Sequence, residues 1–172
     1  MAHNVNWPLA VASVGLPILG GWTSGLFTRQ ALATYYKNLK KPSWTPPPIA
    51  FPIAWTTLYA TMGYASFRVL ARLTGYLPLT TALTTAPMLA YFGQLVLNFS
   101  WTPLFFVKRR PDLAMIDITL LNLGILYTAH EFVKVDRLAG KLLIPYWLWV
   151  SFAGTLNFWI WRNNQPVDKK LY

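Results

Sequence analysis

Long stretches without charged residues divide the chain into hydrophobic blocks. Lys, Arg, Asp and Glu are absent from residues 1–28, 42–67, 73–107 and 142–161, and Asp117 is the only charge between residues 113 and 130. A helix needs about 20 apolar residues to cross the hydrocarbon core of a bilayer. The pattern therefore predicts an all-α integral membrane protein, a bundle of five transmembrane helices within a single domain, residues 1–172. The predicted spans are about 6–27, 47–67, 80–106, 113–131 and 142–161.

Prolines predict where helices begin and end. Leu77-Pro78 is expected to start the third helix and Pro103 to distort its end, because proline lacks an N–H and clashes with the preceding turn. Residues 40–48 contain four prolines, which predicts an ordered extended loop. The first block has neither a basic start nor a small-residue cleavage pattern, and no Arg-rich presequence is visible, so we interpret it as a span.

The composition supports a membrane protein. Charged residues make up 12% of the chain, against about 25% in soluble domains. The net charge of +10 is typical of proteins that bind nucleic acid or an anionic membrane surface, and the position of the charges favours the membrane over nucleic acid. Ten basic residues fall in the first and third connectors and the tail, and five in the second and fourth connectors. The positive-inside rule then places the C-terminus and the first connector in the cytoplasm.

Enzyme chemistry has little support in the sequence. The chain has no cysteine and two histidines, His3 and His130, so no metal ligand set is predicted. No HExxH, GxSxG or phosphate-binding loop occurs, and no lysine lies in the middle of a span. We therefore expect a binding or carrier protein without a cofactor.

Several predicted helix faces carry large or polar side chains. Residues at helical spacing share a face, and three sets do so: Gln94, Asn98, Trp101 and Phe105; Trp55, Tyr59, Met62 and Ser66; Trp149, Ala153, Leu156 and Ile160. Because Gln and Asn are costly against lipid tails, the first of these faces is expected to point inward. The Gln94 set either bonds neighbouring helices or lines a ligand site. For the Trp149 set, core filling is more common than a pocket.

Small residues and one carboxylate add two further expectations. Gly21 and Gly25, one turn apart, predict a close helix contact, within the bundle in preference to a homodimer seam. Asp117 is the only carboxylate well inside a span, where such a residue has either a functional role or a pairing role. A local salt link or helix-start role near Arg110 and Asp112 is the favoured alternative.

Longer motifs make the resemblance to a family specific. They are Leu39-Lys40-Lys41-Pro42-Ser43-Trp44-Thr45-Pro46-Pro47, Trp55-Thr56-Thr57-Leu58-Tyr59 with Met62-Gly63-Tyr64, Gly93-Gln94-Leu95-Val96-Leu97-Asn98 through Trp101, Pro103, Phe105 and Phe106, and Pro145-Tyr146 through Trp149, Phe152-Ala153 and Leu156-Asn157. With these motifs the chain resembles the translocator protein family, also called tryptophan-rich sensory proteins or peripheral benzodiazepine receptors. Leu16-Pro17 with Gly20-Gly21, and Met62-Gly63-Tyr64-Ala65-Ser66, are more similar to the animal branch.

The resemblance implies a five-helix bundle, often a homodimer, whose pocket opens toward the first connector. It implies ligands such as cholesterol or another sterol, protoporphyrin IX and benzodiazepine-type drugs, beside membrane lipid. It implies the mitochondrial outer membrane for animal members, with a bacterial membrane as the alternative. The family's pocket positions correspond to Tyr36, Trp44, Ala54, Trp55, Asn98, Trp101, Leu120, Trp149, Ala153 and Leu156, and Asp117 falls at an acidic position of the family.

The chain departs from the family pattern near its C-terminus. The family's sterol motif has a central tyrosine between Leu and Arg, whereas Phe158 and Trp159 replace tyrosines here. The remaining candidates for sterol contact are Leu156, Phe158 and Arg162. Leu113 stands where mammalian members have tryptophan, which predicts a different drug affinity.

Three functions compete on this basis. The first is a membrane receptor or carrier for planar apolar ligands, with a role in sterol or porphyrin transport. The second is light-dependent porphyrin degradation, for which the tryptophans matching Trp55 and Trp149 are implicated. The third is a structural partner protein of the membrane. For the first, we hypothesise that Trp55 and Trp149 face each other and sandwich the ligand.

Overall fold

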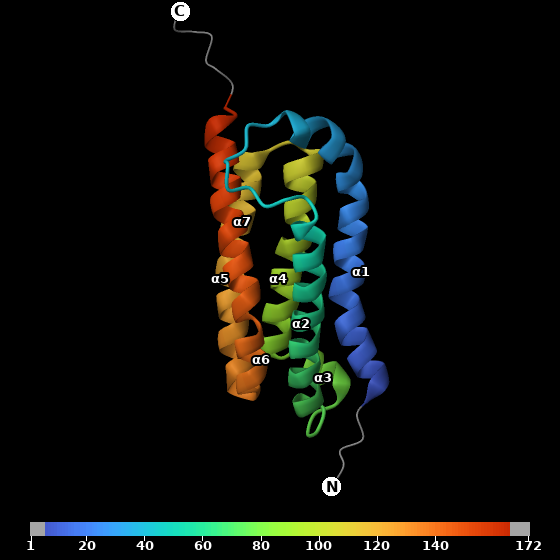
Figure 1. Ribbon diagram of the computed structural model, residues 1–172. Helices are drawn as coiled ribbons and strands as arrows, with labels where there is room; N and C mark the ends of the chain where they lie inside the picture. Colours follow the sequence, from blue (N-terminus) through green and yellow to red (C-terminus); the bar gives the residue numbers. More distant parts are fainter. Residues whose placement is uncertain (1–5, 166–172) are drawn as a thin grey trace, which may run out of the picture.

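Five long helices lie side by side and make up most of the chain (Figure 1). The computed structural model describes residues 6–165, apart from the side chains of Phe27, Arg29 and Gln30. The long helices are α1 (Trp7–Ala31), α2 (Ala50–Leu73), α4 (Ala86–Thr102), α5 (Pro111–Val135) and α7 (Ile144–Asn163). Shorter elements are α3 (Leu79–Leu83), α6 (Arg137–Leu142) and two π-helical turns, η1 (Leu32–Tyr36) and η2 (Pro103–Val107). The all-α class is confirmed for the described residues.

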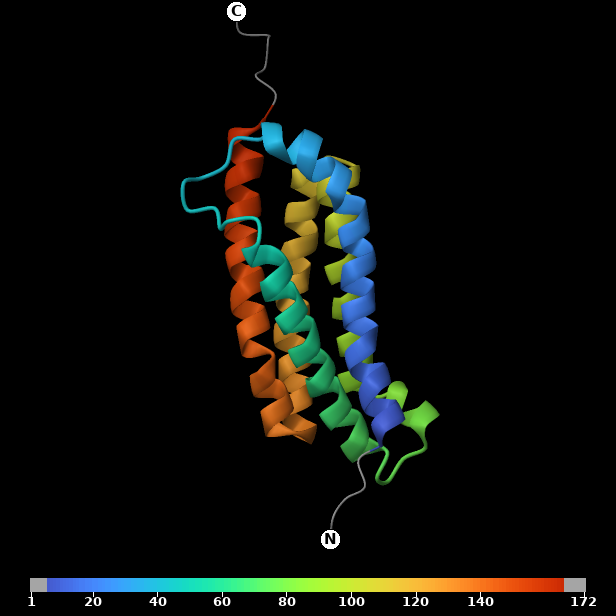
Figure 2. The same ribbon diagram turned by 45° about the vertical axis from the view of Figure 1, so that its right-hand side comes forward.

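The elements connecting the long helices gather at two opposite ends of the bundle (Figures 1 and 2). One end holds η1, the first connector, η2 and the C-terminal end of α7, whereas α3 and α6 lie at the other. α1 packs mainly against α2, and α5 packs against both α4 and α7. Successive long helices therefore alternate in direction, as the predicted order of spans requires.

The third predicted helix, over residues 80–106, is wrong as a single element. The chain forms α3, breaks at Thr84 and Thr85, and begins α4 only at Ala86. Pro87 explains the break, because its ring cannot pack against the carbonyl one turn earlier and it has no N–H to donate. Pro103 does distort the end of α4, as predicted, since η2 begins at that residue.

Helix ends at charged residues also differ from the prediction. α2 continues through Arg68 and Arg72 to Leu73, six residues beyond the predicted end of the span at 67. Arginine is a good helix former, so a charge marks where a helix leaves the apolar layer without ending it. α6 has no counterpart in the prediction; Asp136 caps it by accepting hydrogen bonds from the backbone N–H groups of Leu138 and Ala139.

The proline-rich loop, residues 39–49, is non-helical as predicted. It is tied to the end of α7: the Lys40 N–H donates to Asn164 Oδ1 at 2.9 Å, and Asn164 Nδ2 donates to the Lys40 carbonyl at 3.0 Å. Lys41 Nζ donates to the carbonyls of Tyr36 at 2.7 Å and Leu39 at 2.9 Å. These bonds satisfy backbone groups that the prolines leave without helical partners.

Close contact between α1 and α2 depends on glycines. A β-carbon added at Gly21 would overlap the ring of Tyr59, so the prediction of a close contact there is confirmed. Gly25 has nothing within 4 Å of its added β-carbon, so the paired contact is wrong for this residue within one chain. A close backbone approach that was absent from the prediction lies at Gly63, whose added β-carbon would lie 2.6 Å from Val14 Cα. A homodimer seam remains a prediction.

Apolar side chains cover the outer surface as well as the core. Large exposed hydrophobic residues occur on every long helix, among them Val11, Ile53, Val96, Leu123 and Leu148. Among the described residues, two helices are long and apolar enough by composition to cross a membrane, Trp7–Leu26 and Pro111–Val135. Such a large apolar surface is expected where the solvent is lipid. The predicted number of five spans is not established by this measure.

Candidate functional site: an aromatic end of the bundle

Aromatic rings gather beneath the first connector, where α2, α4 and α7 approach η1 and η2. We call this group the aromatic end; it consists of Tyr36, Trp44, Phe51, Trp55, Trp101, Phe105, Trp149 and Phe152. Trp149 meets the edge of Phe51 at 6.0 Å between ring centroids and lies 5.7 Å from Phe152. Trp44, from the loop, meets Phe152 at 5.7 Å. The loop therefore contributes a ring of its own to this end.

A second part of the aromatic end is centred on Phe105. Trp101 stacks on Phe105 with a centroid distance of 4.9 Å and an interplanar angle of 19°. Tyr36 packs against the same ring at 6.4 Å. Phe105 belongs to a buried cluster with Leu156, and Phe51 packs against that cluster too. Phe51 thus links the Trp101 and Trp149 groups into one continuous region.

A chain of buried polar side chains lies below these rings, and we call it the polar seam. The Tyr59 hydroxyl donates to Asn98 Oδ1, Asn98 Nδ2 donates to the Tyr146 hydroxyl, and that hydroxyl donates to Gln94 Oε1, each at 2.8 Å. The seam joins α2, α4 and α7. The inward orientation of Gln94 and Asn98 is confirmed, and both residues bond neighbouring helices.

Trp55 connects the polar seam to the aromatic end. Its ring stacks on Tyr59 at 5.4 Å and meets the edge of Tyr146 at 6.3 Å. Trp149 packs against Phe51 and Phe152 instead. The two tryptophans that were expected to face each other thus rest on different rings, and whether a ligand lies between them stays a prediction.

Two indole N–H groups are buried without an acceptor. Trp101 Nε1 and Trp149 Nε1 have no hydrogen-bond partner within the part of the chain that the structure describes. A buried tryptophan N–H usually finds an acceptor, and an unpaired polar group in a low-dielectric interior is costly. These donors are therefore suited to an acceptor supplied from outside the chain.

The other predicted site residues divide into two groups. Ala54 and Ala153 are half-buried, and Ala153 packs against the main core. Leu120, by contrast, is 49% exposed on the outer side of α5 and is not brought together with the aromatic end. Of the sterol candidates, Leu156 is buried, whereas Phe158 and Arg162 are exposed, so the three do not share one face of α7.

Asp117 is buried on α5 and forms no salt link with any residue that the structure describes. The local ion pair near this end joins Arg110 to Asp112 at 2.6 Å, and Asp117 Oδ2 accepts no hydrogen bond from the described residues. The favoured alternative of a salt link is therefore wrong for Asp117.

Three residues of the site, Tyr146, Phe51 and Phe152, were missed by reasoning from helix faces. Tyr146 is the centre of the polar seam, and Phe51 links the two groups of rings. Tyr146 lies three residues before Trp149, so the helical spacing that selected Trp149 also selects Tyr146. Phe51 lies just after the prolines, where no helical period was established.

Comparison with known proteins decides the family. The TspO/MBR family matches residues 13–162. The chain belongs to the TspO/MBR family. It is 38% identical over 159 residues to the translocator protein of Sus scrofa, covering 92% of each chain. It is 39% identical over 151 residues to protein CrtK of Rhodobacter capsulatus, covering 88% of this chain and 89% of that protein.

A third relative is the tryptophan-rich protein TspO of Chlorobaculum tepidum, 38% identical over 151 residues and covering 88% of this chain and 92% of that protein. Membership of the TspO/MBR family makes the chain a membrane protein, which agrees with the apolar outer surface of its helices. The matched region includes the loop, the polar seam and every residue of the aromatic end.

Proposed function

We propose that this chain is a membrane receptor or carrier that binds a planar apolar ligand at the aromatic end. The observation that carries the proposal is the pair of buried indole donors, Trp101 Nε1 and Trp149 Nε1, set among rings and lacking acceptors. Ligand sites are mostly apolar and carry a few polar groups that fix orientation. Planar ligands with an acceptor on their edge, such as porphyrins and sterols, meet both requirements.

Entry of such a ligand requires movement of side chains at the loop. The rings of the aromatic end pack on one another, so a ligand can enter only if some of these rings separate and pack against the ligand instead. Trp44 is exposed and touches Phe152 by one edge, which makes it the ring that moves at least cost. The loop stays attached to α7 through Asn164. We therefore propose that the ligand enters beside Trp44 and that the loop closes over it.

The proposed position in the membrane follows from the arrangement of the connectors. We propose that all five long helices cross the bilayer, with the aromatic end and the C-terminus on the cytosolic side of the mitochondrial outer membrane. Ten of the 15 Lys and Arg residues lie in segments assigned to that side, in agreement with the positive-inside rule. A C-terminal tag is expected to be cleaved by protease added to intact organelles, and a protected tag would contradict the orientation.

The ligand site is tested by titration with protoporphyrin IX in the dark, because an illuminated porphyrin can oxidise an indole. Porphyrin absorbance reports binding independently of the tryptophans that are changed. Trp149→Ala and Trp101→Ala each remove one wall and one donor. Loss of a large buried apolar side chain costs about 1–3 kcal/mol, which is roughly a 5- to 150-fold rise in Kd.

The matched control is Trp22→Ala, which removes an exposed tryptophan from the outer side of α1. Its Kd is expected to stay at the parental value. Ala153→Thr, which adds bulk beside the site, is expected to raise Kd by a smaller factor. If the folded Trp101 and Trp149 variants bind as the parent does, the ligand lies elsewhere and the proposed site is wrong.

A further inference from the structure

A hollow lined by arginines lies at the end of the bundle opposite the aromatic end. Its volume is about 480 Å³, and its walls come from the end of α2, the end of α5 and the start of α6. The lining residues are Arg68, Arg72, Val133, Lys134, Val135, Asp136, Arg137 and Leu138. None of these residues takes part in the aromatic end or the polar seam.

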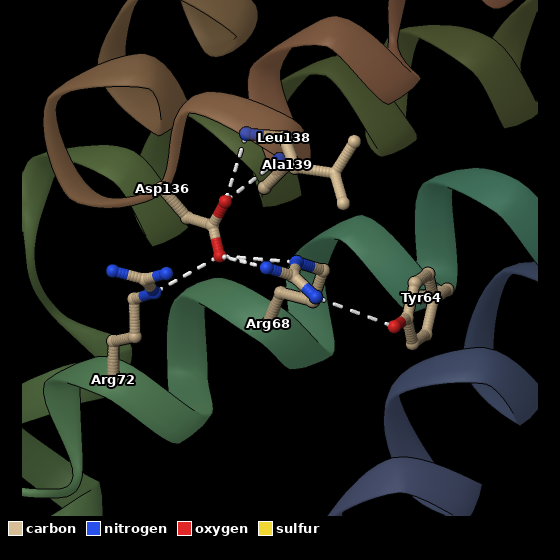
Figure 3. A network of polar contacts seen from close by, with 6 residues as sticks. All are labelled: Tyr64, Arg68, Arg72, Asp136, Leu138 and Ala139. Atoms are coloured by element: carbon tan, nitrogen blue, oxygen red, sulfur yellow. Dashed lines mark hydrogen bonds and ion pairs between the residues drawn. The ribbon is translucent and has the colours of Figure 1, made fainter.

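One buried carboxylate organises the hollow (Figure 3). The side chain of Asp136 is 2% exposed, and its Oδ2 accepts from Arg68 Nε at 3.0 Å and pairs with Arg72 Nε at 2.9 Å. Its Oδ1 accepts from the backbone N–H groups of Leu138 at 2.8 Å and Ala139 at 3.2 Å. Both oxygens are therefore fully used, and two guanidinium groups are fixed on either side of one carboxylate.

The arrangement leaves positive charge unbalanced. Burial alone would raise the pKa of Asp136, but the hydrogen bonds from Ala139, Arg68 and Leu138 outweigh it and lower that pKa, so the carboxylate stays ionised. One negative charge then faces two arginines. The side chain of Arg72 is 57% exposed, and its terminal Nη groups have no partner among the described residues. Arg137, which also lines the hollow, has no side-chain partner there either.

Apolar side chains stand beside these arginines. Val133 is 45% exposed and Leu138 is 46% exposed, and both line the hollow. A soluble phosphate compound has no apolar part that would contact these two side chains. A phospholipid, by contrast, presents a phosphate next to acyl chains. Guanidinium groups are well matched to phosphate oxygens, and basic residues at the membrane surface attract anionic lipids.

From this combination we propose that the hollow binds the phosphate of an anionic phospholipid headgroup. Arg72 and Arg137 donate to the phosphate, Asp136 holds Arg72 in place through its ion pair, and Val133 and Leu138 contact the first carbons of the acyl chains. The site is separate from the proposed ligand site at the other end of the bundle. If phospholipid does not bind in the hollow, the proposal of a ligand site at the aromatic end is unaffected.

The test is a titration of the full chain in detergent micelles with fluorescently labelled phosphatidic acid, and with labelled phosphatidylcholine in parallel. Saturable binding is expected for phosphatidic acid and much weaker binding for phosphatidylcholine. Arg72→Gln and Arg137→Gln should each weaken phosphatidic acid binding about fivefold, the effect of one basic residue near a membrane surface. Because the Arg137 side chain has no hydrogen-bond or ion-pair partner among the described residues, its variant tests the site without disturbing folding.

The matched control is Lys108→Gln, which removes the same charge at the aromatic end and is expected to bind phosphatidic acid as the parent does. Equal losses for Lys108→Gln and Arg137→Gln would indicate general charge attraction and overturn the site. Parental binding by both arginine variants would overturn it too. Inorganic phosphate is added as a competitor in a separate titration. If phosphate alone saturates the hollow and displaces the lipid, the assignment to a phospholipid is wrong.

Discussion

Replacing Tyr146 by phenylalanine removes a single hydroxyl from the centre of the polar seam. That hydroxyl accepts from Asn98 Nδ2 and donates to Gln94 Oε1, both at 2.8 Å, and the side chain is 1% exposed. The ring remains, so the packing against Trp55 is retained. The substitution leaves one amide N–H and one amide C=O without partners in an interior where no bulk water replaces them.

The size of the effect follows from the number of bonds lost. A hydrogen bond contributes about 0.5–1.5 kcal/mol to the stability of a soluble protein, and measured values between membrane helices average about 0.6 kcal/mol. Tyr146→Phe breaks two bonds, so we expect a loss of about 1–3 kcal/mol in the free energy of unfolding. Tyr59→Phe breaks only one bond, to Asn98, and is expected to cost about half as much.

The assay is reversible unfolding in mixed micelles of a mild detergent and sodium dodecyl sulfate, followed by circular dichroism. Tyr76→Phe is the matched control, because this tyrosine is exposed and lies outside the seam. The expected order of destabilisation is Tyr146→Phe, then Tyr59→Phe, then Tyr76→Phe at the parental value. If Tyr146→Phe costs no more than Tyr76→Phe, the seam contributes nothing to stability and the reasoning is refuted.

Two further predictions concern packing and pH. Gly21→Ala should destabilise the fold by about 1–3 kcal/mol, because the new methyl group overlaps the ring of Tyr59. Gly25→Ala, where the methyl group meets open space, should be neutral or slightly stabilising; equal thermal shifts for the two variants would contradict this packing. The folded-state pKa of Asp136 is lowered, so its contribution to stability is present above about pH 4 and is lost as the pH falls through the folded-state pKa. Asp136→Asn should remove that part of the acid dependence of Tm, and an unchanged dependence would count against the network.

The helix pattern could be predicted because the bilayer imposes it on the sequence. Stretches with at most one charge located every long helix, and Pro103 marked the distortion at η2. The break between α3 and α4 at Thr84 and Thr85 was missed, because one uncharged run contains both elements and only Pro87, in the first turn of α4, indicates the break. α6 was missed because it is only six residues long and is stabilised by the cap at Asp136. The carboxylate of that cap is itself held by Arg68 and Arg72 of α2, which are distant in the sequence.

Contacts between helices were predicted less well than helix faces. Helical spacing placed Gln94 and Asn98 toward the interior, which is correct, but spacing alone does not say which residue they meet. Tyr146 as their partner depends on the relative rotation of α4 and α7. The small-residue pattern likewise identified Gly21 and overlooked Gly63, since the positions four residues before and after Gly63 hold Tyr59 and Phe67.

Trp55 belongs to the proposed ligand site and also packs against the polar seam that stabilises the fold. It stacks on Tyr59 and touches Tyr146, so two residues of the polar seam hold its ring in position. Phenylalanine at position 59 or 146 keeps the rings that support Trp55 and removes only hydroxyl groups. A fold weakened at the seam should therefore still bind protoporphyrin IX with nearly the parental Kd, provided that it remains folded. A large loss of binding in folded Tyr146→Phe would mean that the hydroxyl contacts the ligand itself and that the site extends down into the seam.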